Sequence, residues 1–181
     1  MYFKKRYILF LFAAVAAFSC ESNFKEVQRI NSVVFSPATE ADSINLKYTD
    51  SGKVKAVLVS TKMHDYSILE YRFNEFPKGI HVTLYDDNGQ QTNIVADYAI
   101  NYAKTSIIDL QGHVKITTQD GKKMETEQLY YDQKNEWFYT ERYFKFTDGA
   151  GGYLEGPGID FSKDFKYMNT QQSSGQVNNI K

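Results

Sequence analysis

The sequence predicts an all-β protein built from antiparallel β-hairpins that stack into one body. Short turns rich in aspartate and glycine recur along the chain, and the segments between them alternate apolar with polar residues. Asp-Gly and Asn-Gly pairs supply the positive-φ residues that hairpin turns require. Because a single hairpin cannot bury its apolar face, several must stack or curl together. The turns are Asp50-Ser51-Gly52, Asp86-Asp87-Asn88-Gly89, Asp120-Gly121 and Asp148-Gly149.

Residues 1–19 are predicted to be a signal peptide. A basic start, Lys4–Arg6, precedes the uncharged apolar run Tyr7–Phe18, which is shorter than the roughly 20 residues that a membrane-spanning helix needs. The run ends at Ala17-Phe18-Ser19-Cys20, which resembles the lipobox of bacterial lipoproteins. Cys20 is therefore the expected lipidation site and mature N-terminus. An ordinary signal-peptidase site at Ala14-Val15-Ala16 and an uncleaved anchor are the alternatives.

Cysteine usage and charge limit the function further. Cys20 is the only cysteine, whereas structural cysteines in an oxidising compartment usually come in pairs, so lipid attachment is the simpler role. Several acyl chains would give stable membrane anchoring. The chain has 22 acidic residues against 21 Lys and Arg, which gives no support to nucleic-acid binding.

After the signal peptide the chain divides into segments by its residue patterns. Residues 20–43 are polar without a sustained period and are predicted to form a tether. Residues 44–168 are predicted to form the β domain, and residues 169–181 a flexible tail rich in Gln, Ser and Asn. The pattern of His64–Pro77 fits a helical stripe or an irregular strand, with the strand favoured. A chain of this length fits one domain.

Alternation within the β domain assigns apolar side chains to one face of each strand. The first strand, Ile44–Tyr48, is expected to pair across Gly52 with Lys53–Thr61. On the next hairpin, the positions expected to share a face are Ile80, Val82 and Leu84, and on the return strand Ile94, Ala96, Tyr98 and Ile100. The later units carry Val114 and Ile116, Leu129 and Tyr131, Trp137 to Tyr139, and Phe144 and Phe146.

No constellation of residues in the sequence predicts an active site. The stretch Gly149-Ala150-Gly151-Gly152-Tyr153 lacks the features of a dinucleotide or phosphate loop, which favours a loose hairpin turn. The histidines lack the spacing of metal ligands. Glu125 and Glu127 would point the same way from a strand, but the lysines beside them favour a solvated edge over acid–base catalysis. The sequence therefore predicts a protein that is not an enzyme and needs no metal or cofactor.

Two segments carry short motifs in a defined order. Leu110–Ile116 contains the step Gly112-His113-Val114 and is followed by a glycine turn and the strand Thr126–Asp132, which reads Thr-x-x-Leu-x-Tyr-Asp. Near the end of the domain, Gly156-Pro157-Gly158-Ile159 forms a Gly-x-Gly-apolar step. Both resemble the repeat of the OstA-like β-jellyroll proteins of lipopolysaccharide export.

With its N-terminal anchor and one jellyroll-sized domain, the chain resembles the LptC family over about residues 40–168. That family is the periplasmic bridge component of the lipopolysaccharide transporter. The resemblance implies a single antiparallel β-jellyroll with an open groove along one side, held at the periplasmic face of the inner membrane. The family is commonly held by an uncleaved helix, whereas this chain looks lipidated, so the difference concerns the anchor.

The resemblance also implies partners and sites. The chain would accept lipopolysaccharide from the permease subunits of an inner-membrane ABC transporter and pass it to a periplasmic OstA-like jellyroll protein. Gly156 and Gly158 are expected to let the last strands bend, with a simple turn around Pro157 as the alternative, and Gly112 is expected to be a structural residue of the Gly112-His113-Val114 step. Ile159 and Phe161 are candidates for docking the next jellyroll. The residues expected to line an acyl-chain groove, rather than a sealed core, are Ile80, Val82, Leu84, Ile94, Ala96, Val114, Ile116, Phe144 and Phe146.

A second class of function is compatible with the same patterns. The chain could be a periplasmic or surface β-rich lipoprotein that binds a protein or polysaccharide, with a closed core and exposed Tyr or Trp platforms. Co-purification separates the two hypotheses, because an ABC transporter in the pull-down favours the bridge and a glycan-binding signal favours the alternative.

Overall fold

The computed structural model describes residues 36–176, and these residues confirm the all-β prediction. They form one antiparallel sheet that folds over on itself as a β-jellyroll, and they include no helix. The strands are β1 (Thr39–Asp50), β2 (Lys53–Asp65), β3 (Phe73–Phe76), β4 (Ile80–Tyr85), β5 (Gln91–Ala96), β6 (Tyr98–Tyr102), β7 (Ile107–Thr118), β8 (Lys123–Asp132), β9 (Trp137–Thr147), β10 (Tyr153–Ser162), β11 (Met168–Thr170) and β12 (Ser174–Gln176).

The predicted hairpins are confirmed. The four Asp/Gly turns join β1 to β2, β4 to β5, β7 to β8 and β9 to β10, and each pair is antiparallel. In the β4–β5 turn the first aspartate binds the backbone: the Asp86 carboxylate accepts hydrogen bonds from the N–H groups of Asn88 and Gln90 at 2.9 and 2.8 Å. Such local bonds to the backbone favour turns over continued strand, so the hairpins follow from short-range chemistry.

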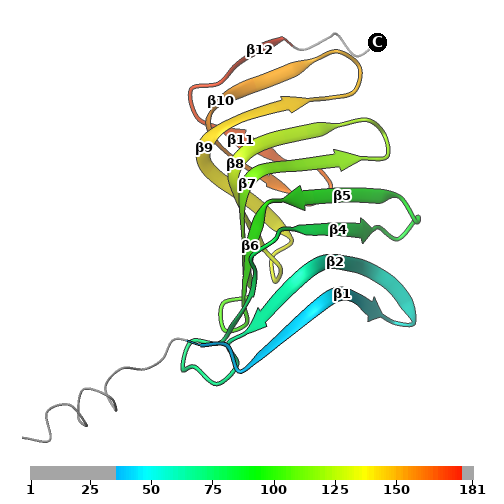
Figure 1. Ribbon diagram of the computed structural model, residues 1–181. Helices are drawn as coiled ribbons and strands as arrows, with labels where there is room; N and C mark the ends of the chain where they lie inside the picture. The colour runs from blue at the N-terminus through cyan, green and yellow to red at the C-terminus, as the bar shows by residue number, and fades with distance from the viewer. Residues whose placement is uncertain (1–35, 177–181) are drawn as a thin grey trace, which may run out of the picture. The chain divides into compact units, whose positions relative to one another are not determined.

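The sheet folds into two layers because the long strands bend and run through both. Residues 107–111 of β7 pair with β6, whereas residues 115–118 pair with β5. β4 and β5 lie only in the first layer, which contains the hairpin tips, and β3 and β6 lie only in the second. Figure 1 shows the four hairpins side by side, with β1 and β12 at opposite ends of the sheet.

The bends coincide with glycines in a left-handed conformation. The register of β7 against β8 shifts between Gln111 and Val114, and Gly112 within this shift has φ +72°. A Cβ at Gly112 would lie 2.9 Å from the Asp97 carboxylate, so a larger residue would require the Asp97 side chain to shift. Gly158, with φ +84°, stands at the corresponding shift between β9 and β10. A bulge with a positive-φ residue bends a strand without ending it.

The hydrophobic core lies between the two layers. The first layer contributes residues such as Ile116 and Phe144, and the second layer residues such as Leu129 and Phe138, all of them fully buried. Phe165, in the turn after β10, stacks on Phe146 and on Phe161 with ring centroids 5.7 and 4.8 Å apart. This side chain therefore connects the two layers near the C-terminal end of the sheet.

One prediction about side-chain orientation is wrong. Tyr98 and Ile100 were expected on the same face as Ile94 and Ala96, but the strand breaks at Asp97 into β5 and β6. Beyond the break Ala99 is the buried residue, at 0% exposure, and Tyr98 and Ile100 point to the outer face. The Asp97 N–H donates to the Gly112 carbonyl at 3.0 Å, outside the regular ladder, and this irregular residue reverses the alternation.

The ordered domain extends beyond the expected boundaries. β1 begins at Thr39, inside the expected tether, because residues 39–42 pair with the end of β2. β11 and β12 lie almost entirely in the expected tail and pair with β10. His64–Pro77 contains the end of β2, a turn and β3. The predicted signal peptide and Cys20 lie outside the described residues, and within residues 36–176 no helix has the length and apolar character to span a bilayer.

Candidate functional site

A row of apolar side chains crosses the inner face of the first layer from one edge of the sheet to the other. Each member is the direct cross-strand partner of the next, so their side chains are neighbours on one face. From β1 to β10 the row is Leu46, Leu58, Val82, Ile94, Ile116, Met124, Phe146 and Leu154.

Exposure along this apolar row rises toward β1. Ile94 is 3% exposed and Ile116 is fully buried, whereas Val82 and Leu58 are half-buried and Leu46 is 50% exposed. Tyr48, on the same face of β1, is 65% exposed. β1 has only β2 as a neighbour among the described strands, so the second layer covers less of its inner face. The apolar interior is therefore accessible to solvent at the β1 end.

The structure brings all the predicted groove residues to the inner face but at different depths. Val82 and Leu84 are half-buried, next to the exposed part of the row. The others are buried in the core at 7% exposure or less: Ile80, Ile94, Ala96, Val114, Ile116, Phe144 and Phe146. The accessible part of the predicted site is thus confined to the strands nearest β1.

Sequence reasoning missed Leu46 and Tyr48, the most exposed apolar side chains on the inner face of the first layer. Their alternation with Ile44 predicts a strand, but alternation does not show how many neighbours that strand has. The sequence signal for their exposure is that an alternating apolar strand face occurs in the first hairpin of the series, at the edge of the sheet. An edge strand of this kind leaves its inner face incompletely covered.

The residues predicted to dock a partner, Ile159 and Phe161, are core residues. Their side chains are 3% and 0% exposed, and the backbone beside them pairs with β11. Gly156 is also buried, and a Cβ there would lie 3.0 Å from the Cα of Ser173. Docking at this edge stays a prediction, and it would have to use the backbone of β10 in place of β11 and β12.

A polar network on the outer face ties the accessible end of the sheet together. The Glu75 carboxylate accepts hydrogen bonds from the hydroxyls of Tyr98, at 2.7 Å, and Tyr66, at 3.3 Å, and contacts His64 Nδ1 at 3.0 Å. Burial by itself would raise the pKa of Glu75, but these hydrogen bonds outweigh it and lower the pKa below its usual value. The network connects β2, β3 and β6, and so fixes the second layer behind the exposed inner face.

Replacing Glu75 by glutamine is expected to lower the free energy of unfolding by about 1–2 kcal/mol at pH 7, because the hydrogen bonds to a charged acceptor are lost. Since the folded-state pKa is lowered, this stabilisation is present above the unfolded pKa of about 4.3 and disappears as the pH falls through the folded value. Urea unfolding at pH 7 and at pH 3 measures both effects.

The control is Glu125→Gln, which removes an exposed ion pair with Lys115 at 2.9 Å. We expect a loss of less than about 0.5 kcal/mol, as is usual for exposed pairs. Equal losses for the two variants, or a Glu75→Gln loss that does not shrink at low pH, would contradict the role assigned to the Glu75 carboxylate.

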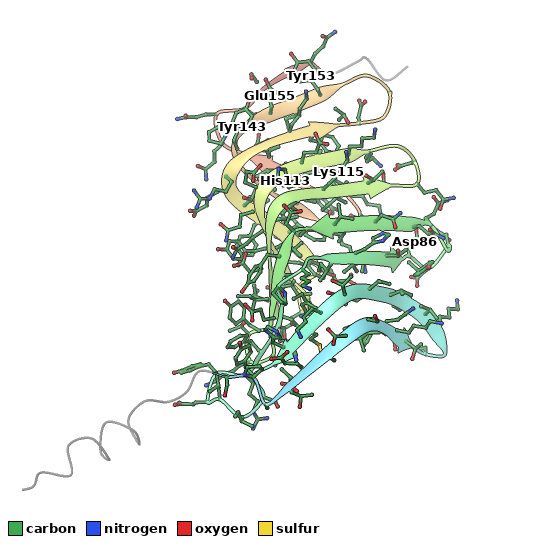
Figure 2. All side chains as sticks on the ribbon, in the orientation of Figure 1. Asp86, His113, Lys115, Tyr143, Tyr153 and Glu155 are labelled. Atoms are coloured by element: carbon green, nitrogen blue, oxygen red, sulfur yellow. The ribbon has the colours of Figure 1, made fainter. Side chains whose placement is uncertain are left out.

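A second ionic contact lies at the bend of β7. His113, labelled in Figure 2, has φ +43° and contacts the Asp97 carboxylate through Nδ1 at 2.6 Å. The hydrogen bond and charge of Asp97 raise the pKa of His113. Both side chains are largely exposed, so the pair supports the bend rather than forming a reactive centre.

Among residues 36–176, the exposed part of the apolar row contains neither a cluster of metal ligands nor the polar surface pocket. Within residues 36–176 no group of three or more His, Cys, Asp and Glu side chains is arranged to hold a metal ion. A shallow surface pocket lies between β5 and the end of β7, and it shares no residue with the apolar row. Its lining side chains are Gln91, Asn93, Thr118 and Gln119. The exposed part of the apolar row is the larger apolar feature, with Leu46 at 50% exposure and Tyr48, on the same face of β1, at 65%.

The family comparison agrees with this geometry. The sequence matches the family model "Lipopolysaccharide-assembly, LptC-related" over residues 7–169, which is most of the chain. A search of curated proteins found no match. Proteins of this family take part in lipopolysaccharide transport and are associated with the inner membrane on its periplasmic side. The jellyroll, the apolar inner face and the family match together establish that the chain belongs to the LptC-related family of lipopolysaccharide-assembly proteins.

Proposed function

We propose that the chain is a membrane-anchored bridge that accepts lipopolysaccharide from an inner-membrane ABC transporter and passes it to the next periplasmic β-jellyroll protein. The observation that carries the proposal is the rise in exposure of the inner apolar row toward β1, where Leu46 is 50% exposed. A sealed β-sandwich would cover such residues. Lipidation of Cys20 would keep the domain at the membrane.

The physical need for such a site follows from the cargo. Exposing an acyl chain to water costs about 0.8 kcal/mol per CH₂, or on the order of 10 kcal/mol for a dozen carbons. A glycolipid with several chains therefore cannot cross an aqueous compartment unaided at a useful rate. Transfer from one apolar face to an equivalent one is nearly neutral in free energy, so the direction comes from ATP hydrolysis by the transporter.

The proposed contact site comprises the accessible inner-face residues on β1 and the next two strands of the first layer, β2 and β4. An acyl chain would first meet Tyr48 and Leu46 on β1 and then the half-buried Leu58, Val82 and Leu84. Cargo that moves deeper would have to separate the layers, because the remaining residues of the row are packed in the core. Opening at the β1 edge would separate β1 from a single strand, since among the described strands β1 pairs with β2 alone.

Site-specific photo-crosslinking tests the contact site. A photoreactive amino acid at Leu46 or Val82 is expected to capture lipopolysaccharide in cells during active transport. The same group at Lys47 or Thr83, which are adjacent in sequence but point to the outer face, is expected to capture none. The proposal fails if neither inner position gives an adduct, or if inner and outer positions give equal adducts.

The bridging role has its own test. The intact membrane protein is expected to co-purify with the subunits of an ABC transporter after mild detergent extraction. Recovery of a glycan-binding signal without a transporter would instead favour the reading as a polysaccharide-binding lipoprotein.

A further inference from the structure

β10 pairs with β9 along one edge, and the chain's own C-terminal segment pairs with its other edge. We call residues 168–176 the strap. In the second layer its first part, β11, pairs Met168–Thr170 with β10, and in the first layer its last part, β12, pairs Ser174–Gln176 with β10. Figure 1 shows both short strands against β10 at the end of the sheet opposite β1. The strap therefore covers the β10 edge in both layers.

The path of the strap reproduces the path of β1. β1 runs first through the second layer, as residues 39–42, and then through the first layer, as residues 44–50, antiparallel to its neighbour in both. The strap also passes from the second layer to the first, antiparallel to β10 in both. Each changes layer next to a residue in the left-handed conformation, Ser43 with φ 57° and Gln172 with φ 47°.

The strand directions would also allow β1 of a second copy to pair with β10 in place of the strap. In the first layer the order is β1, β2, β4, β5, β7, β8, β9 and β10, and every neighbouring pair is antiparallel. β1 and β10 consequently run in opposite directions. If a second copy stacked on the β10 end in the same orientation, its β1 would run antiparallel to β10, as the strap does now.

The strap adds little apolar contact to the edge. Apart from Thr170, its side chains are all exposed, and it contains no charged residue and no aromatic residue. Opposite Leu154, the last member of the apolar row, it places only Gly175. A β1 strand carries Leu46 and Tyr48 on its inner face, so it would continue the apolar row where the strap interrupts it. Short, polar edge strands are a recognised protection against unwanted strand pairing.

We propose that the strap is a removable cap, which imitates β1 and so prevents β10 from pairing with the β1 strand of a second copy of this chain. Such pairing would be head-to-tail, so uncapped copies would join into rings or open-ended arrays. β1 is available for it, because within residues 36–176 it pairs only with β2. The proposal concerns the sheet edges and does not depend on the cargo.

A single substitution can loosen the strap without shortening the chain. Gly175 lies so close to β10 that a Cβ there would overlap the carbonyl oxygen of Tyr153 and lie 3.0 Å from the Cα of Leu154. Gly175→Val is therefore expected to lift β12 from the edge. Ser174→Val is the matched control, because it adds the same side chain one residue earlier, at an exposed position.

The experiment uses the full chain with two different tags, co-expressed in cells. A photoreactive amino acid replaces Tyr153, which is 40% exposed on β10. We expect at least a fivefold increase in adducts between differently tagged copies for Gly175→Val over both the unsubstituted strap and Ser174→Val, with the crosslink mapping to residues 39–50. Adding Leu46→Lys, which places a charge on the inner face of β1, is expected to abolish the increase.

Several results would overturn the proposal. These are equal adduct levels in the three forms, adducts that map outside residues 39–50, and capture of a different protein in place of a second copy. Limited proteolysis shows whether Gly175→Val retains the domain. A chain that ends after Tyr167 provides a second test, because it lacks the strap without introducing a clash, and it too must yield adducts between copies.

Discussion

Replacing Phe138 by alanine is expected to lower the free energy of unfolding by about 3–5 kcal/mol. The Phe138 ring is fully buried and stacks on Tyr131 and Phe161, with ring centroids 4.4 and 5.2 Å away. Truncation removes both contacts, and the strands on each side, which are fixed by their hydrogen-bond ladders, cannot move in to close the cavity. Urea unfolding followed by the fluorescence of Trp137, the only tryptophan, measures the loss.

The matched control is Tyr143→Ala on the same strand. Tyr143 is 61% exposed on the outer surface, near Tyr153 and Glu155 in Figure 2, so its loss is expected to change stability by about 0.5 kcal/mol or less. Similar losses for the two variants would show that the stacked aromatic residues between the layers do not form the stabilising core.

The hairpins could be predicted from the sequence because their causes are local. In Asp86-Asp87-Asn88-Gly89 the aspartate binds the N–H groups of the turn and the glycine adopts φ +79°, all within a few residues. Alternation then assigned the inner faces correctly wherever a strand is regular, as in Ile80, Val82 and Leu84.

The folding of the sheet into two layers could not be predicted from such local signals. Asp97 has no unusual neighbours in the sequence, and its role depends on Gly112, which the fold brings beside it. Because Asp97 interrupts the alternation, Ala99 became the core residue in place of Tyr98. A reversal of this kind depends on contacts between distant strands, whereas residue periodicity reports only on near neighbours.

The depth of burial at the candidate site also could not be predicted from the sequence. Ile94 and Leu46 are equivalent in pattern and lie in the same apolar row, yet one is 3% exposed and the other 50%. The difference is the number of strands on either side, which follows from the position in the sheet. The two ends of the sheet differ in the same way: the β1 end exposes the apolar face, and the β10 end carries the strap.

Replacing Gly79 by alanine is expected to lower the free energy of unfolding by about 2–5 kcal/mol. Gly79 has φ +78°, which costs a residue with a Cβ about 1–2 kcal/mol. A Cβ there would also lie 2.5 Å from the Ala96 carbonyl oxygen and 3.2 Å from that of Asp97, and relieving such overlap typically costs about 1–3 kcal/mol more. Urea unfolding monitored by circular dichroism measures the change.

Gly89→Ala separates the two contributions, because Gly89 has nearly the same φ, +79°, but nothing within 4 Å of a Cβ. We expect a loss of about 1–2 kcal/mol for this variant, from the backbone alone. The difference between the two losses would then measure the energetic cost of the overlap between a Cβ at residue 79 and the carbonyl oxygens of Ala96 and Asp97. Equal losses would mean that the backbone there can move aside and relieve the overlap, so that the close approach adds no cost beyond the positive φ.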